Sequence, residues 1–229
     1  MAAKKSKASE RGDARVLVID VGGNNVKVAL GDQPLPIKVP SGREMTAEAM
    51  VAGVKEAIGG WVFDRVSLGF PGPVRDNRPA REPVNLAGGW LALDYERAFG
   101  APVRVVNDAA LQALGNHEGG RMLFLGLGTG LGTTLVGDEF VHALELAHLP
   151  YRKGRSYEDY VGERGLERLG KKKWSEHVFH VVELLRDALQ AADIVLGGGQ
   201  TKRLAALPPG VRKGRDDAAI VGGVRLWAR

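Results

Sequence analysis

The chain has 229 residues and a mass of 24.5 kDa, which allows one large domain or two small lobes. Hydrophobic residues make up 44% and charged residues 26% of it, so the composition is globular and excludes wholesale disorder. The absence of cysteine excludes disulfides, thiolate metal sites and cysteine nucleophiles, and no apolar run reaches the ~18 residues of a membrane-spanning helix.

Basic residues occur in a short N-terminal stretch and in several later clusters. Residues 1–13 are basic, small and polar and lack the apolar stretch of a secretory signal, so we expect a disordered tail, a cytoplasmic protein and no membrane partner. The net charge is +5, and its clusters are typical of solvated faces or, alternatively, of a surface that attracts a polyanion. Aromatic residues form only 6% of the chain, which argues against a base-stacking surface and a specific nucleic-acid partner.

Each half of the chain begins with a glycine turn between two apolar strands. Residues Arg15–Gly31 contain an apolar strand, a glycine turn and a second alternating strand, and the same arrangement returns at Arg121–Gly137. One such hairpin is a weak signal, but its repetition predicts a duplicated α/β architecture with a cleft between the halves.

The first half is predicted to continue through helices and strands. Helical spacing of apolar residues predicts a helix, and short apolar runs predict strands. The elements are a helix from about Thr46 to Ile58, a strand over Val66–Phe70 ending in the turn Gly69–Pro73, a Pro- and Arg-rich loop to Trp90, a strand over Val103–Val106 and a helix over Ala109–Asn116. We expect Asp108 to cap the last helix, because its carboxylate can accept a hydrogen bond from a free amide.

The second half is predicted to follow its own hairpin in the same manner. The elements are a short helix near Leu144–His148, a basic stretch, a long helix over Ser175–Ala191, a strand over Asp193–Leu196 running into Gly197–Gly199, another helix, and a closing helix over Ala218–Leu226. The apolar face of the long helix repeats at helical spacing and indicates that it packs on a sheet.

The first glycine turn follows an aspartate at the end of a strand. Glycines let the backbone approach a ligand closely and turn their amides toward an anion, and an aspartate there can hold Mg²⁺ through water. A tight hairpin with asparagines as turn residues is an equally good interpretation of this segment alone. The residues concerned are Asp20, Gly22, Gly23, Asn24, Asn25 and Lys27.

The second glycine turn, within Gly126–Thr134, has the spacing of a dinucleotide-binding loop. A Rossmann turn opens a helix, however, whereas this turn leads into a β-branched, apolar strand. A Walker A motif is absent as well. The interpretation that remains is a hairpin that grips phosphate with the amides of Gly128 and Gly130 and the hydroxyl of Thr129.

A third polar turn, Asn107-Asp108, ends a strand in the middle of the chain and so is expected to face the cleft. A carboxylate at this place can accept the proton of an alcohol while the alcohol attacks phosphorus. Taken alone, capping of the next helix is the favoured role for Asp108.

A fourth candidate site contains Glu145 and His148, with Glu158 a short way on. Glu and His three residues apart share one face of a helix, which suits hydrogen bonds to neighbouring hydroxyls of a sugar. A pair of this kind is more often an ordinary surface pair, and without cysteines it is a weak metal site. We expect His177 and His180 to be structural or exposed.

In this order the motifs resemble those of the ROK family of sugar kinases, most closely its polyphosphate- and ATP-dependent glucokinases, over nearly the whole chain. Each motif is weak alone, but so many in one order are hard to reach by chance. The matching segments are the D-x-G-G turn at Asp20–Lys27, G-x-P-G at Gly69–Pro73, the loop Asn85–Trp90, the turn Val106–Ala109, the phosphate motif Gly126–Thr134, E-x-G-H at Glu145–His148 and the glycine loop Gly197–Gly199.

The resemblance implies a duplicated actin-like ATPase fold (ribonuclease H-like), with an N-terminal lobe at 14–107, a C-terminal lobe at 108–229 and a central cleft. It also implies phosphorylation of the 6-hydroxyl of a hexose, in the first place glucose, with ATP or polyphosphate as donor, Mg²⁺ as cofactor and a homodimer as a common assembly. Asp108 would be the catalytic base and Asp20 would position Mg²⁺. The residues implied for the sugar are Asn85, Asn107, Glu145, His148 and Glu158, and Gly198 and Gly199 join the two glycine turns as the residues implied for the donor.

Three departures from the family pattern favour an alternative. Asn24 stands where the family has threonine, Ala147 replaces the glycine of E-x-G-H, and the family's cysteine-rich zinc loop is missing. The alternative is a sugar- or phosphate-sensing protein that keeps the fold without catalysis, and intact Asp20 and Asp108 count against it. The family's transcription regulators are a weaker match, because a tail of about fourteen residues is too short for a helix-turn-helix domain.

Overall fold

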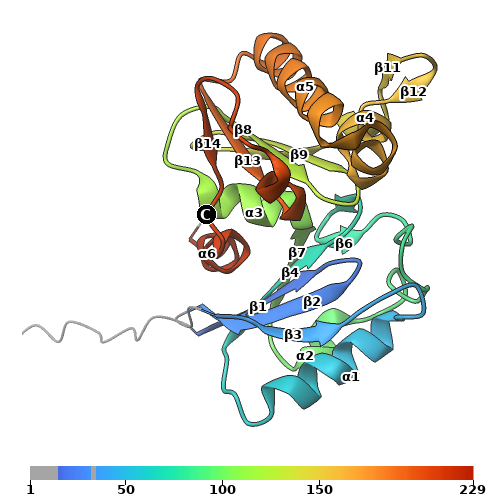
Figure 1. Ribbon diagram of the computed structural model, residues 1–229. Coiled ribbons are helices and arrows are strands. Elements are labelled where there is room, and N and C mark those ends of the chain that lie inside the picture. Colours follow the sequence, from blue (N-terminus) through green and yellow to red (C-terminus); the bar gives the residue numbers. More distant parts are fainter. Residues whose placement is uncertain (1–14, 32–34, 229) are drawn as a thin grey trace, which may run out of the picture.

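The computed structural model describes residues 15–31 and 35–228, so the predicted tail at 1–13 lies outside the described residues. It contains two five-stranded sheets with helices between them and on their outer faces (Figure 1). No helix in the described part of the chain combines the length and the apolar character that crossing a bilayer requires.

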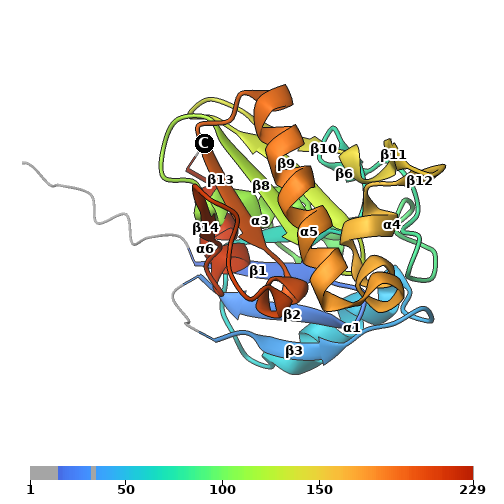
Figure 2. The same cartoon turned by 45° about the horizontal axis from the view of Figure 1, so that its top comes forward.

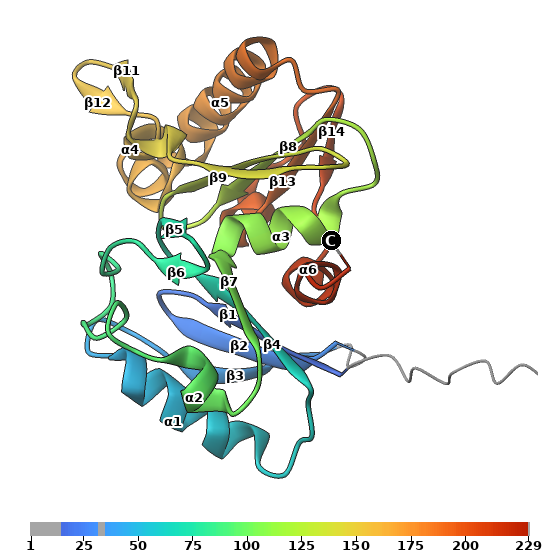
Figure 3. The same cartoon turned by 180° about the vertical axis from the view of Figure 1, so that it is seen from behind.

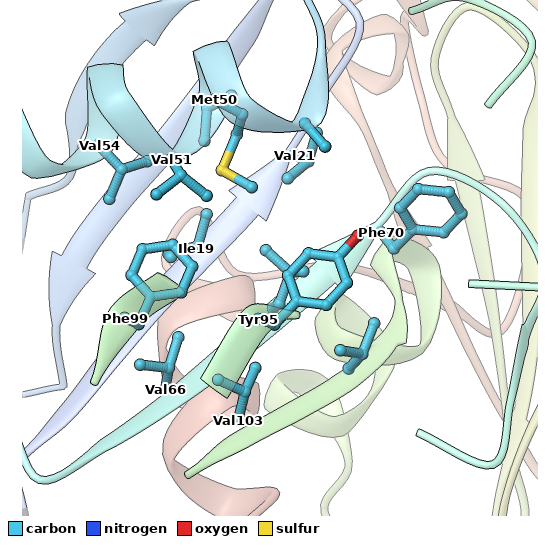
Figure 4. Packing of buried hydrophobic residues seen from close by; sticks show 14 of the residues in the cluster. Ile19, Val21, Met50, Val51, Val54, Val66, Phe70, Tyr95, Phe99 and Val103 are labelled. Carbon is cyan, nitrogen blue, oxygen red and sulfur yellow. The ribbon is translucent and has the colours of Figure 1, made fainter. Parts of the chain in front are cut away.

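The first sheet has the strand order β3-β2-β1-β4-β7, with β1, β4 and β7 parallel and with β2 and β3 joined to them through antiparallel pairs. Its strands are β1 (Val16–Val21), β2 (Asn25–Leu30), β3 (Ile37–Pro40), β4 (Arg65–Phe70) and β7 (Val103–Asn107). The helices α1 (Ala47–Ile58) and α2 (Tyr95–Phe99) cover its outer face. Figure 4 shows this core, in which Met50 and Val51 of α1 face Ile19 of β1.

The second sheet repeats this topology with the order β10-β9-β8-β13-β14, which confirms the predicted duplication. Its strands are β8 (Met122–Leu127), β9 (Leu131–Val136), β10 (Val141–Leu144), β13 (Asp193–Gly197) and β14 (Val211–Lys213). The helices α4 (Glu158–Val161) and α5 (Glu163–Leu189) cover its outer face. Two small ribbons complete the fold, β5 (Val74–Arg75) with β6 (Arg78–Pro79) and β11 (Pro150–Arg152) with β12 (Arg155–Ser156) (Figure 2).

Two further helices form a layer between the sheets (Figure 3). They are α3 (Asp108–Asn116) and α6 (Ala218–Arg225). A Cβ atom at Gly115 would lie 1.8 Å from the carbonyl oxygen of Ala218, and one at Gly222 would lie 1.8 Å from the carbonyl oxygen of Leu111. The two helices therefore meet backbone to backbone, an approach that glycine permits because it has no Cβ.

The end of the chain packs on the first sheet. The hydroxyl of Ser67 donates to the carbonyl oxygen of Gly223 at 2.7 Å, and the indole nitrogen of Trp227 donates to that hydroxyl at 2.9 Å. The guanidinium groups of Arg65 and Arg104 lie over the Trp227 ring at 5.0 and 4.6 Å. The predicted division into an N-terminal and a C-terminal lobe stays a prediction, and the structure adds that α6 contacts the sheet of the first half.

Two predicted helices have different lengths. The helix expected near Leu144–His148 is a single 3₁₀ turn, η1 (Leu146–His148), because Leu144 belongs to β10. The helix expected after the glycine loop is also short, η2 (Gly199–Arg203). Both segments are fixed by strand pairing and by contacts with the neighbouring hairpin, which local spacing does not reveal.

The long helix of the second half begins earlier than predicted. It was expected over Ser175–Ala191, whereas α5 begins at Glu163. Gly170 has φ 73° and ψ 159°, so two helical segments meet there at a kink. Charged residues and glycine around this kink hide the first segment from a search for apolar periodicity.

Replacing Gly115 by alanine should destabilise the protein, although alanine is the better helix former by ~1 kcal/mol. The new methyl group would meet the carbonyl oxygen of Ala218 at 1.8 Å, and this oxygen belongs to a helix backbone that must move. We expect a loss of about 1–3 kcal/mol in the free energy of unfolding, measured by urea denaturation. In the control Gly60→Ala nothing lies within 4 Å, so equal stability of the two variants would contradict this packing.

Thr134→Val should raise stability, because the buried hydroxyl of Thr134 has no hydrogen-bond partner in the described structure. We expect a gain of about 1 kcal/mol in the free energy of unfolding, since an unsatisfied buried hydroxyl is removed without a change of shape. The matched control is Thr133→Val on the same strand, which removes a hydrogen bond to the carbonyl oxygen of Leu144 and should lower stability. Thermal unfolding of both variants checks the opposite signs, and a loss in Thr134→Val would refute the assignment.

Candidate active site

The carboxyl ends of β1, β4 and β7 meet at one edge of the first sheet. Asp20 is paired in register with Gly69, and Gly69 is paired with Val106. A Cβ atom at Gly69 would lie 3.4 Å from Oδ1 of Asp20 and 3.4 Å from Cα of Asp108. Asp20 and Asp108 therefore both border Gly69.

Asn107 caps helix α3. Its Oδ1 accepts hydrogen bonds from the backbone nitrogens of Ala109 at 3.0 Å and Ala110 at 3.2 Å, and its Nδ2 donates to the carbonyl oxygen of Gly72 at 3.1 Å. The prediction that Asp108 caps this helix is wrong, because the amide of the preceding residue already reaches the free N–H groups. Asp108 is the first helical residue, and its carboxylate accepts from the nitrogen of Ala109 at 2.8 Å.

The start of α3 also touches the second sheet. A Cβ atom at Gly132 in β9 would lie 2.9 Å from the Cβ of Ala109, and Ala109 packs in one cluster with Phe124 of β8. Asp108 therefore lies between the carboxyl edge of the first sheet and the hairpin formed by β8 and β9.

The surroundings of Asp108 favour the protonated form of its carboxyl group. Burial, the negative charge of Asp20 and then that of Glu145 raise the pKa of Asp108 from 3.8 to about 7, while the hydrogen bond from the N–H of Ala109 opposes the rise. Asp20 belongs to the first half of the chain and Glu145 to the second, so carboxylates from both halves act on this group. A carboxyl group with a pKa near 7 suits a general base at neutral pH.

The hairpin of β1 and β2, which we call the first phosphate hairpin, carries Asp20 at the end of β1. Asp20 is 5% exposed, and the Nζ atom of Lys27, its cross-strand partner, lies 3.2 Å from its Oδ2. The backbone nitrogen of Gly22 donates to the carbonyl oxygen of Asn25 at 3.1 Å and closes the turn. The remaining turn residues, Gly23 and Asn24, are exposed, so a ligand can reach this turn.

The hairpin of β8 and β9, the second phosphate hairpin, lies beside the glycine loop that follows β13. The nitrogen of Gly128 donates to the carbonyl oxygen of Gly130 at 3.2 Å, which closes the turn and leaves Thr129 exposed. Gly198 has φ 83°, and a Cβ atom there would lie 2.3 Å from the carbonyl oxygen of Leu127. The loop at Gly198 and Gly199 therefore rests directly on this hairpin.

The structure brings Glu145, His148 and Glu158 together. Nε2 of His148 lies 3.8 Å from Oε2 of Glu145, and its Nδ1 lies 3.8 Å from Oε1 of Glu158. A Cβ atom at Gly130 would lie 2.6 Å from Oε2 of Glu158, so this group borders the second phosphate hairpin. The side chain of His148 is 68% exposed, which leaves the group open to a ligand.

Asn85 is exposed, in the loop that leads to Trp90. Trp90 itself is fully buried, with its ring 5.6 Å from that of Phe70 and its indole nitrogen donating to the carbonyl oxygen of Ala87 at 2.8 Å. Trp90 thus fixes the loop in the core of the first half and leaves Asn85 accessible.

A pocket of about 470 Å³ opens between the sheets beside Asn107. Its lining residues include Val74, Val106, Asn107, Ala110 and Leu114 from one side and Val141, His142, Ala143 and Leu144 from the other. Val74 follows the turn Gly69–Pro73 and Leu144 precedes Glu145, so the pocket adjoins two segments that sequence analysis assigned to the sugar.

The oxygen ligands that this site offers suit Mg²⁺. Within the described residues, no group of three or more histidine or acidic side chains could hold a metal by itself. The buried carboxylate of Asp20 offers the oxygen ligand that Mg²⁺ prefers, and this ion keeps several waters and binds phosphate oxygens. Asp20 is thus suited to hold the ion together with water and a phosphate ligand.

Two residues at these hairpins escaped sequence analysis. The hydroxyl of Ser41 donates to the carbonyl oxygen of Gly22 at 2.6 Å, and its nitrogen donates to that of Asn24 at 3.1 Å. Glu163 donates its backbone N–H to the carbonyl oxygen of Gly128 at 3.1 Å. Ser41 carries no local signal, whereas Glu163 would have been found if the start of α5 had been placed correctly.

Comparison with solved structures establishes the fold. An inorganic polyphosphate/ATP-glucomannokinase from Arthrobacter sp. strain KM aligns with a TM-score of 0.78 and 24% identity, over 94% of this chain and 98% of that one. A ROK family glucokinase from Streptomyces griseus, in complex with glucose and AMPPNP, aligns with a TM-score of 0.73 and 18% identity, over 93% of this chain and 98% of that one. A ROK family transcriptional regulator, a homologue of the E. coli MLC protein, aligns with a TM-score of 0.69 and 13% identity, over 94% of this chain and 78% of that one.

These likenesses confirm the predicted actin-like α/β fold class. A search of the curated proteins found no match. The model of the ROK family matches residues 16–143, more than half of the chain. The chain therefore belongs to the ROK family.

Proposed function

We propose that this protein is a hexose kinase, which transfers a phosphoryl group from ATP or polyphosphate to the 6-hydroxyl of a hexose, in the first place glucose. The observation that carries the proposal is the place of Asp108. This carboxyl group, with a pKa of about 7, lies at the start of α3 beside the carboxyl end of β1 and the second phosphate hairpin.

Asp108 would take the proton of the sugar hydroxyl as that oxygen attacks the terminal phosphorus. Its pKa of about 7 leaves much of it ionised at neutral pH while keeping it basic enough to accept a proton. Asn107 supports this role because its amide caps α3, so the carboxylate of Asp108, whose Oδ1 accepts from the nitrogen of Ala109, can offer Oδ2 to the reaction.

The sugar ring would be held by the acid–histidine group. Glu145 and Glu158 offer accepting oxygens, each 3.8 Å from a different ring nitrogen of His148, a spacing that suits neighbouring hydroxyls. One N–H of the Asn107 amide binds Gly72, so its second N–H is the group available for a sugar oxygen. Asn85, which is exposed in the loop before Trp90, would add an amide to this set.

The donor phosphates would bind the two glycine hairpins and the loop at Gly198 and Gly199, whose accessible amides suit an anion. Asp20 would hold Mg²⁺, which supplies positive charge to the transferring phosphate when bound. The transition state of phosphoryl transfer is loose, so positioning and charge stabilisation provide most of the acceleration. Movement of the two halves toward each other would exclude water that hydrolyses the donor.

The alternative, a sugar- or phosphate-sensing protein without catalysis, rests on Asn24, Ala147 and the trimmed loop that lacks the zinc site. Ala147 is 6% exposed and packs in the core of the second half, so its methyl group is accommodated there and need not enter the sugar site. This favours the kinase. A cytoplasmic homodimer, expected from the family resemblance, belongs to the same proposal.

Asp108→Asn should abolish turnover and leave sugar binding nearly unchanged. We expect kcat to fall about 10²–10⁴-fold, because the amide cannot accept the proton, while the sugar Kd changes less than about threefold. For the unaltered protein, kcat/KM should rise with pH and level off above about 7, since the carboxylate is the active form. A coupled assay with a sugar panel against ATP and polyphosphate, together with calorimetry, measures both.

The matched control for this variant is Asp187→Asn, an exposed aspartate on α5 whose side chain lies outside the site. Near-normal turnover in Asp108→Asn would overturn the assignment of the base. Sugar binding by the unaltered protein without product from any donor would favour the sensing alternative.

Asp108→Asn should also stabilise the protein at high pH. The pKa of Asp108 is raised in the folded state, so the stability that this group contributes is complete below about pH 4 and is lost as the pH rises to about 7. Asparagine removes this loss, and we expect the variant to be more stable by about 2–4 kcal/mol at pH 8 and by much less at pH 4. Urea denaturation across this range tests the prediction, and a difference independent of pH would refute the raised pKa.

A further inference from the structure

A pair of polar side chains at the border of the second phosphate hairpin has no role in the reaction proposed above. Oε1 of Glu163 accepts a hydrogen bond from Nε2 of Gln200 at 3.1 Å. Glu163 is the first residue of α5, and Gln200 lies in η2, directly after the glycine loop. Both residues are half-buried, so the pair joins the two segments that flank the hairpin at a place that solvent reaches.

The carboxylate of Glu163 is held in place by backbone contacts with the hairpin. Its N–H donates to the carbonyl oxygens of Gly128 at 3.1 Å and Thr129 at 3.2 Å. A Cβ atom at the preceding residue, Gly162, would lie 2.7 Å from the carbonyl oxygen of Thr129. Gly198 also contacts the backbone of Leu127 in this hairpin, so the Glu163–Gln200 pair occupies a fixed position next to the turn.

We infer that Glu163 makes this protein select a nucleoside triphosphate over polyphosphate, by accepting hydrogen bonds from the hydroxyls of the ribose. The inference rests on the proposed function, because it requires the donor phosphates to bind the second phosphate hairpin. Oε1 of Glu163 is oriented by Gln200, and within the described residues Glu163 forms no salt bridge. The carboxylate therefore keeps its capacity to accept further hydrogen bonds.

Polyphosphate and a nucleoside triphosphate would bring different chemical groups next to the carboxylate of Glu163. Polyphosphate carries a negative charge on every unit, so the part of it that extends past the hairpin would approach a carboxylate, which is unfavourable. A nucleotide places a neutral ribose there, and a carboxylate is the group that accepts hydrogen bonds from ribose hydroxyls in other nucleotide sites. Exposed Lys202 and Arg203 at the far end of η2 are the feature that would favour polyphosphate, so the test includes them.

Equilibrium binding measured by calorimetry without sugar, so that no transfer occurs, tests the inference. The ligands are ATP, 2′,3′-dideoxy-ATP and a polyphosphate of defined length, each with Mg²⁺. The unaltered protein should bind ATP about tenfold more tightly than the dideoxy analogue, because hydrogen bonds to a charged group are lost. In Glu163→Ala the two nucleotides should bind within about twofold of each other, and polyphosphate should bind several-fold more tightly than before.

Glu167→Ala is the matched control, because it removes the same charge from an exposed position one turn further along α5. It should leave the tenfold ratio unchanged. Gln200→Ala is the second variant, for the case that Glu163→Ala does not fold. This variant keeps the carboxylate of Glu163 but removes the hydrogen bond that orients it. The ratio of the affinities for ATP and the dideoxy analogue should then fall to about threefold.

Three results of the binding measurements would overturn the inference. One is equal affinity of the unaltered protein for the two nucleotides, and another is a ratio that persists in Glu163→Ala. The third is polyphosphate binding tighter than that of ATP and lost in the double variant Lys202→Gln/Arg203→Gln. Binding that depends on the ribose without any sugar phosphorylation would instead refute the proposed function alone, and sugar phosphorylation that polyphosphate supports and ATP does not would refute the inference alone.

Discussion

The backbone-to-backbone contact of α3 with α6 is the constraint on which the rest of the structure depends. Gly115 and Gly222 let the two helices form one thin layer, whose opposite faces meet the inner faces of the two sheets. Because α3 begins at Asp108, this packing also sets where the proposed base stands. The carboxylate is thus positioned by the core of the molecule and not by a surface loop, which suits a site that must be held precisely.

The position of Asp108 combines its proposed role in the reaction with a cost in the stability of the fold. Burial and the carboxylates of Asp20 and Glu145 keep a proton on Asp108 at pH values where an isolated aspartate is ionised. A neutral side chain would be easier to accommodate between the sheets, so the folded protein tolerates an acid there against its own stability. Such conflicts are common where function requires a group that packing does not favour.

The parts of the fold that sequence analysis predicted are those governed by local pattern. The helix that ends at Ile58 and the two glycine hairpins follow apolar periodicity and turn residues. The cap of α3 was misassigned because Asn107 and Asp108 are adjacent and both suit the role, so only the three-dimensional path decides between them. Ser41 was missed because its partners lie in a distant segment, and Glu163 because the start of α5 was predicted too late. Spacing suggested a sugar contact only for Glu145 and His148, and the family resemblance supplied the wider set of proposed sugar residues.

The path of the chain between the sheets has a consequence for how the two halves depend on each other. It leaves the first sheet at the junction of β7 and α3, and it returns after β14, where α6 and Trp227 bind β4 through Ser67. The last residues of the chain thus complete the packing of its first sheet, so damage to either end of the described chain should weaken both sheets together.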